Sequence, residues 1–243
     1  YVAWNWKANG GTTSSNSNGT ITSTVQANTT AGFSIVTWSG NETNGATIGH
    51  GLSSAPKIII TKGRSHATSW IFGIGPITGS VNDYFTLNTD SAKGNLTNFY
   101  QSYTSDSNTT FTVGVSSADE MNRNTGGTAR TYVSYCFTEI EGYSKLGSYI
   151  GNGFADGRFV HTGFRPAWLL IKKTSGNQDF VLIDTKRDPL NLAFRRLEAN
   201  NSDAEAEGTS YNNMDLLSNG FKFRADGGNT NASGGTYIYM AFA

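Results

Sequence analysis

Large apolar residues alternate with small or polar residues in three short stretches of the chain. The stretches are residues 1–6 (YVAWNW), 132–137 (YVSYCF) and 237–242 (YIYMAF), and their second, fourth and sixth positions are always large and apolar. A period of two residues is typical of a β-strand with one face on a core. We therefore predict a strand at each stretch.

Several other landmarks recur at one spacing of 110 residues along the chain. They are the prolines Pro56 and Pro166, the phenylalanines Phe111 and Phe221, and the glycine-aromatic pairs at 32–33 and 142–143. A fixed internal period indicates a repeated structural unit. We predict a tandem duplication of residues 31–140 and 141–243.

Each copy contains short apolar runs separated by turn residues. Glycine is abundant at 29 residues, and Ser, Thr and Asn fill the breaks, which is typical of many strands joined by tight turns. The runs 58–60 and 168–171 are apolar throughout and predict central strands that are buried on both faces. The pattern predicts an all-β fold of two tandem antiparallel β-sandwich, jelly-roll-like repeats of about 105–110 residues each. The strands expected in copy one are residues 33–38, 46–50, 57–62, 69–74, 83–88, 110–115 and 130–140.

The chain before the first copy has no partner repeat. We expect residues 1–8 to form the closing strand of an upstream domain, or a swapped strand. Residues 9–30 are predicted to be a linker and a first strand, because 9–20 (NGGTTSSNSNGT) is of low complexity and residues 21–27 alternate again.

The charge balance argues against two classes of partner. The chain has 18 basic and 18 acidic side chains, so it lacks the basic surface that nucleic acid or anionic lipid attracts. No apolar run approaches the roughly 20 residues that span a bilayer. We predict no nucleic-acid partner and no membrane insertion. The single cysteine, Cys136, is expected to be a small strand residue.

Three residues are candidates for ligand binding. His66 and Trp70 lie on one polar loop, where a histidine could hydrogen-bond a sugar and a tryptophan could stack on it. Trp38 ends a strand at a Ser-Gly-Asn turn and is expected to be half exposed. His50 and His161 stand at equivalent places in the two copies, which favours a turn hydrogen bond over a ligand role.

The sequence contains no pattern that identifies a catalytic or metal site. The nucleophile motif G-x-S-x-G is absent. Asp184 and Asp188 form a pair of carboxylates, which suggests glycoside hydrolysis, but they have no equivalents in the first copy. The acidic segment 200–208 does not have the spacing of a calcium loop. We predict no catalytic residue, no metal ligand and no cofactor, and we leave open whether a loop binds an ion.

The phrases GFSIVTW, IGHGLSSAPKIIITK, GFRPAWLLIKK and LLSNGFKFRADGGNTN resemble the C-terminal region of virion structural proteins of marine tailed phages. In those proteins the region commonly follows a lectin-like domain of the concanavalin A or laminin-G type. The resemblance implies a non-enzymatic module of a tail fibre or of a surface- or capsid-decorating fibre, located on the virion, which is an extracellular particle.

The same resemblance implies partners. They are further copies of the chain, with a trimer favoured, other virion proteins, and a host-surface glycan. A carbohydrate-binding, lectin-like module is the alternative function, and a polysaccharide-degrading enzyme is the third.

Overall fold

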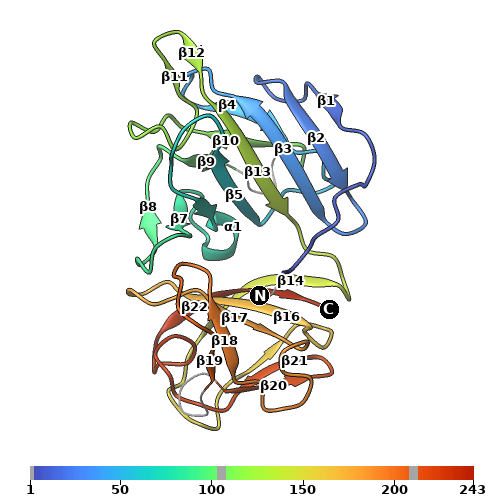
Figure 1. The fold of residues 1–243 in the computed structure, drawn as a ribbon, viewed down its shortest axis with the longest axis vertical. Coiled ribbons are helices and arrows are strands. Elements are labelled where there is room, and N and C mark those ends of the chain that lie inside the picture. Colours follow the sequence, from blue (N-terminus) through green and yellow to red (C-terminus); the bar gives the residue numbers. More distant parts are fainter. Residues whose placement is uncertain (1–2, 103–107, 208–212) are drawn as a thin grey trace. The chain divides into compact units, whose positions relative to one another are not determined.

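The computed structural model describes residues 3–102, 108–207 and 213–243, and it divides into two units (Figure 1). Unit 1 contains the chain up to Phe85 and Gly94–Glu139, and unit 2 contains Thr86–Lys93 and Ile140–Ala243. The chain therefore passes from one unit to the other three times. Strands dominate both units, and the described residues contain one helix, α1 (Gly75–Thr78), which is far too short to cross a membrane. The all-β prediction is confirmed.

Unit 1 has a large antiparallel sheet of order β1-β2-β3-β13-β5-β6-β7-β8, a small sheet of order β4-β10-β9, and the hairpin β11-β12. In Figure 1, β13 lies between β3 and β5. The strands are β1 (Ser14–Asn16), β2 (Ser23–Asn28), β3 (Phe33–Ser39), β4 (Ala46–Gly49), β5 (Ile58–Gly63), β6 (Ile71–Gly73), β7 (Asp83–Thr86), β8 (Gly94–Asn95), β9 (Tyr100–Ser102), β10 (Thr110–Val113), β11 (Asn124–Thr125), β12 (Thr128–Ala129) and β13 (Thr131–Phe137).

The strand at 132–137 is confirmed as β13, but its side chains that face the core of unit 1 are the ones between the large apolar positions that the alternation marked. Tyr132 and Cys136 are fully buried there, beside Val36, Ile59 and Phe111. Burying several large side chains of this kind stabilises a sandwich by about 1.5–3 kcal/mol each. Ile58, on the other face of β5, is also fully buried, as expected for a central strand.

Unit 2 repeats this plan with fewer strands. Its large sheet has the order β14-β22-β16-β17-β18-β19, and its small sheet has the order β15-β21-β20. Tyr237 and Phe221 are fully buried in its core. The strands are β14 (Ser144–Ile150), β15 (Phe159–His161), β16 (Trp168–Lys173), β17 (Val181–Asp184), β18 (Arg195–Glu198), β19 (Ala206–Glu207), β20 (Met214–Leu217), β21 (Gly220–Phe223) and β22 (Thr236–Phe242).

The strand orders of the two units correspond. The order β3-β13-β5-β6 in unit 1 has the counterpart β14-β22-β16-β17 in unit 2, and β4-β10-β9 has the counterpart β15-β21-β20. The tandem duplication that the sequence predicts would produce this correspondence. The duplication itself stays a prediction.

The strand registers correct one predicted equivalence. Ile48 pairs with Phe111, and Val160 pairs with Phe221, so the residue two positions after Ile48, His50, corresponds to Thr162 and not to His161. His50 is fully buried and its Nδ1 accepts a hydrogen bond from the Leu52 amide at 3.1 Å. The predicted turn hydrogen bond of His50 is confirmed, whereas His161 is exposed.

The N-terminal segment also differs from the prediction. Residues 3–13 contain no strand, and Trp6 instead lies edge-on to Phe137 with ring centroids 6.1 Å apart. Residues 1–2 of the predicted strand lie outside the described residues. The predicted linker contains β1, which is formed by two serines and an asparagine and pairs with β2.

Candidate functional site

Two of the three candidate residues contact one tyrosine of unit 1. Trp38, on β3, stacks on Tyr132 with ring centroids 4.5 Å apart, and His66, in the loop after β5, meets the same ring edge-on at 5.5 Å. The Tyr132 hydroxyl donates to the Asp119 carbonyl at 2.9 Å and accepts from the Arg123 amide at 3.0 Å. Burial raises the pKa of Tyr132 to about 12, so the hydroxyl keeps the proton that it donates.

Both ring nitrogens of His66 are engaged in this loop cluster. Nε2 lies 2.8 Å from the Asp119 carbonyl, and Nδ1 lies 3.1 Å from the Ser65 hydroxyl. A carbonyl only accepts, so Nε2 is the donor in the contact with Asp119. His66 therefore holds two loops together.

Asp119 is the centre of an ion-pair cluster at this end of unit 1. Its two carboxylate oxygens lie 3.2 Å from Arg123 and 3.3 Å from Arg130, and Arg123 also pairs with Glu42 at 3.3 Å. Glu42, Asp119 and Asn122 have positive φ angles of 58°, 65° and 55°, a region that costs a residue with a side chain about 1 kcal/mol or more. These left-handed residues of unit 1 thus lie in or beside its ion-pair cluster.

Unit 2 has glycine at the places of Glu42 and Asp119, and of these two glycines only Gly153 has a positive φ, of 67°. The Tyr237 hydroxyl bridges the Gly228 carbonyl and the Ala232 amide, as Tyr132 bridges Asp119 and Arg123. Gly153 donates its amide to the Asn231 carbonyl, as Glu42 donates to Asn122. The charge cluster is therefore specific to unit 1. No local sequence pattern predicts it, because its members come from three separate loops.

The expectation that Trp38 is half exposed is wrong. Its exposed fraction is 4%, and Nε1 donates to the Ser134 hydroxyl at 3.2 Å. The Ser134 hydroxyl is also hydrogen-bonded to the Thr61 hydroxyl at 2.8 Å. The Thr61 hydroxyl in turn accepts from the hydroxyl of the fully buried Tyr100 at 2.7 Å. Trp38 is unavailable for stacking on a ligand because it belongs to a polar network inside the core.

Trp70 lies on the opposite face of the large sheet from His66. It is partly exposed, stacks on Tyr135 with centroids 6.3 Å apart, and has the Lys62 ammonium 5.6 Å from its ring centroid. Tyr135 and Tyr132 are three positions apart on β13, so their side chains face opposite sides. The structure therefore does not bring Trp70 and His66 into one site.

A pocket of about 520 Å³ lies elsewhere in unit 1. Pro56 and Pro76 contribute to its walls, and Lys57 and Glu139 line it as an ion pair at 2.5 Å. The Ser54 and Thr138 hydroxyls, 2.8 Å apart, are also in its lining. The volume falls in the range of about 300–1,000 Å³ that is usual for small ligands, and the balanced charges suit a neutral polar molecule. Its residues match no sequence motif, so sequence reasoning missed it.

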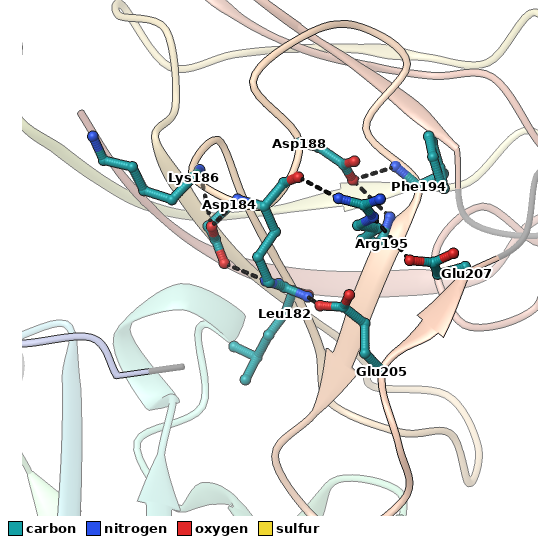
Figure 2. A network of polar contacts seen from close by, with 9 residues as sticks. Leu182, Asp184, Lys186, Asp188, Phe194, Arg195, Glu205 and Glu207 are labelled. Carbon is teal, nitrogen blue, oxygen red and sulfur yellow. Dashed lines mark hydrogen bonds and ion pairs between the residues drawn. The ribbon is translucent and has the colours of Figure 1, made fainter. Parts of the chain in front are cut away.

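The two carboxylates that suggested hydrolysis belong to a scaffold network in unit 2 (Figure 2). Asp184 accepts from the Lys186 and Arg187 amides at 3.0 Å and pairs with the Arg187 guanidinium at 2.6 Å. Asp188 accepts from the amides of residues 194 and 195 at 2.8 and 2.6 Å. Both side chains are nearly fully buried, so the carboxylates stabilise the segment between β17 and β18.

A buried lysine fixes the part of unit 2 that comes from residues 86–93. Lys172 is fully buried, and its ammonium donates to the carbonyls of Asp90, at 2.8 Å, and Gln178. The Gln178 amide donates to the same Asp90 carbonyl at 2.9 Å, and the Phe180 ring centroid is 5.0 Å from the ammonium. Burial lowers the pKa of Lys172 to about 8.

The acidic segment, residues 200–208, also contributes ion pairs to the scaffold. Glu205 pairs with Arg187 at 2.9 Å. Glu207 pairs with Arg195 at 3.1 Å, and these two residues are labelled in Figure 2. Residue 208 lies outside the described residues. Within the described ranges, no group of three His, Cys, Asp or Glu side chains is arranged to hold a metal ion.

The fold and these clusters define a class: an all-β protein of two antiparallel multi-sheet units. The chain belongs to the family described as a domain of unknown function, DUF7483, whose family model matches residues 1–243. No curated protein and no solved structure matches the chain.

Proposed function

We propose that this chain is a non-enzymatic structural module of a phage virion, located in a tail fibre or in a surface- or capsid-decorating fibre. The sequence phrases that resemble virion proteins give the viral assignment. The observation that carries the structural role is the triple passage of the chain between the two units.

The triple passage suits a part that bears load. Two domains joined by one linker separate when their ends are pulled. Here, separation would also require the extraction of residues 86–93 from unit 2. That segment is held by the Lys172 ammonium and by backbone hydrogen bonds such as Lys93 amide to Thr174 carbonyl at 3.3 Å. Leaving a buried ammonium without its carbonyl partners is costly.

The use of polar side chains also supports a structural role. The described carboxylates that drew attention as catalytic candidates, Asp184 and Asp188, accept hydrogen bonds from backbone amides. His66 spans two loops. A general acid or base instead needs access to a substrate proton.

The test is immunogold electron microscopy of particles of the phage whose genome encodes the chain, with antibodies raised against residues 1–243. Gold on fibres or on the capsid surface is the expected result, and pre-immune serum is the control. Antigen in infected cells with none on purified particles would contradict the proposal. Release of reducing sugars from host polysaccharide by the purified chain would contradict its non-enzymatic part.

A second candidate function is glycan binding, favoured by the partly exposed Trp70 and by the pocket beside Lys57 and Glu139. A glycan array tests both sites when Trp70→Ala and Thr138→Val are compared with the wild type. Phe154→Ala removes an exposed aromatic ring of unit 2 and serves as the matched control. Loss of binding in one of the first two variants alone would identify the site, and no binding by the wild type would remove this candidate.

A further inference from the structure

Among the described residues, strand β15 of unit 2 has a partner strand on one edge only. Its residues Phe159–His161 pair with β21 on one side, and β15 is the outermost strand of the small sheet. An open edge offers backbone N–H and C=O groups to another chain, and natural proteins usually protect such edges.

The corresponding edge in unit 1 is covered by the chain itself. Ile21 forms a parallel bridge with Ile48 on β4, and its amide donates to the Thr47 carbonyl at 3.0 Å. The Thr47 amide donates to the Thr20 hydroxyl at 2.9 Å, and the Ser23 hydroxyl donates to the Gly49 carbonyl at 2.8 Å. The outward-facing amide of Thr47 and the carbonyls of Thr47 and Gly49 are thus satisfied.

The strand registers identify the equivalent groups in unit 2. Ile48 and Val160 pair with equivalent phenylalanines, so Thr47 corresponds to Phe159 and Gly49 corresponds to His161. The Arg158 carbonyl and the Thr162 amide hydrogen-bond toward β21 and its turn. Because these directions alternate along an antiparallel strand, the N–H and C=O of Phe159 and His161 point to the open edge. Within the described ranges, no segment pairs with that edge.

A segment like the one in unit 1 does not fit this edge. The Asn16 side chain lies so close to Gly49 that a Cβ there would be 2.0 Å from the Asn16 Oδ1. Unit 2 has His161 at that position, with a full side chain. The occupant of β15 must therefore follow a different path.

The side chains of β15 favour an apolar, aromatic partner. Phe159 is 43% exposed and Phe154, nearby in sequence, is 67% exposed, and the rings of Phe159 and His161 are 6.4 Å apart, inclined at 61°. The strand itself contains no lysine or proline, which are the residues that commonly block edge pairing.

A second copy of β15 meets these requirements. In an antiparallel pair centred on Val160, Phe159 of each copy lies opposite His161 of the other, and both residues present their backbone groups outward. Two such pairs make four backbone hydrogen bonds, and each places a phenylalanine across from a histidine ring. Arg158 of each copy lies opposite Thr162 of the other, so no like charges face each other.

We propose that β15 is a self-association edge through which two copies of this chain form a twofold, antiparallel contact. The contact is closed and isologous, and it is distinct from the threefold assembly that the family resemblance implies. It does not depend on the proposed virion role.

Sedimentation velocity of the full chain from micromolar to millimolar concentration tests the contact. We expect a reversible monomer–dimer equilibrium, with a dissociation constant raised about tenfold or more by Phe159→Lys, which keeps every backbone group but places a charge at the pair. His161→Pro removes an outward amide without removing a bond to β21 and should have the same effect. Leu190→Lys changes a residue of unit 2 that is 78% exposed and should leave the equilibrium unchanged.

Hydrogen exchange gives a second, site-specific measurement. The Phe159 amide should exchange more slowly at high protein concentration, whereas the Thr47 amide, already bonded within unit 1, should not change. A chain that stays monomeric at every concentration, a trimer with no dimer, or a dimer that persists in both β15 variants would overturn the proposal.

Discussion

The burial of His50 predicts a specific loss of stability in acid. The imidazole is fully buried in unit 1, and its Nδ1 accepts from the Leu52 amide at 3.1 Å, a bond that requires an unprotonated Nδ1. Burial lowers the pKa of His50 to about 4, whereas an unfolded histidine has a pKa of about 6.5. Between these two pH values His50 is protonated in the unfolded chain but neutral in the folded chain.

The sign and size of the effect follow from this difference. Stability contributed by the neutral imidazole is complete above about pH 6.5 and is lost as the pH falls toward about 4. Each pH unit in the interval costs about 1.4 kcal/mol, so about 3 kcal/mol is lost between pH 7 and pH 4. A loss of that size is a large part of the stability of a typical domain, about 5–15 kcal/mol.

The variant His50→Asn isolates this contribution. Its Oδ1 occupies the place of Nδ1 and can accept the Leu52 amide, but it does not titrate. The histidines His66 and His161 and all carboxylates remain in both proteins, so their titrations cancel in the comparison. His50→Asn should be less stable than the wild type at pH 7, because it fills less of the core, and its stability should fall less steeply with pH.

Urea unfolding followed by tryptophan fluorescence is the assay. The chain has five tryptophans, and Trp168→Phe leaves only those of unit 1, so the signal reports the unit that contains His50. The difference in unfolding free energy between the wild type and His50→Asn should shrink by about 3 kcal/mol from pH 7 to pH 4. Parallel pH profiles, or a His50 titration midpoint near pH 6.5 by NMR, would refute the reasoning.

Three further predictions test other parts of the scaffold. Burial lowers the pKa of Lys172 from about 10.5 to about 8, so between these pH values the unfolded chain binds a proton that the folded chain has released, and stability should rise with pH. Lys172→Met should abolish this rise in urea unfolding curves. An unchanged rise would contradict the lowered pKa of Lys172. Trp38→Phe should cost about 1–2 kcal/mol, because the Ser134 hydroxyl loses its donor, and equal melting temperatures would show that the buried network is unimportant. Gly19→Ala should destabilise unit 1 by about 1–3 kcal/mol, since its Cβ would lie 2.3 Å from the Thr47 carbonyl oxygen. Gly11→Ala is the control, because the atom nearest to its Cβ would be 3.8 Å away. Equal losses of stability in calorimetry would argue against the close contact at Gly19.

Local patterns in the sequence were sufficient to predict the strands at the centre of each unit. The alternation in 132–137 and 237–242 became β13 and β22, but it did not identify the buried face. The core of unit 1 receives Tyr132 and Cys136, which lie between the large apolar positions, and β22 is buried on both faces. Alternate residues of a strand lie on one face of the sheet. The same rule predicts the burial of Trp38, since it lies two residues after the buried Val36. The Ser-Gly-Asn turn that follows Trp38 suggested exposure, but the inward direction of alternate residues determined its position.

Contacts between distant segments were not predictable in this way. His66 and Asp119 are 53 residues apart in sequence, and nothing local to either residue marks the other. The same holds for Asp90 and Lys172, which are 82 residues apart. Residues 86–93 read as the end of a strand and a polar loop, and only the folded chain shows that a lysine of unit 2 binds them. Nonlocal hydrogen bonds leave little trace in residue type, because a backbone carbonyl is available at every position.

The comparison of the two units indicates where specific properties of this chain reside. Features present in both, such as the hydroxyl bridges of Tyr132 and Tyr237, are explained by the needs of the scaffold. Features present in one unit need another reason. Unit 1 places Glu42 and Asp119 at left-handed positions and uses both side chains in an ion-pair cluster. In unit 2 the place of Glu42 is taken by Gly153, which is also left-handed with a φ of 67°. In the described parts of unit 2, no segment covers the edge that unit 1 covers with residues 20–23. A scaffold alone would favour glycine at the first place and a covered edge at the second, so these two asymmetries are the positions at which mutation should separate function from folding.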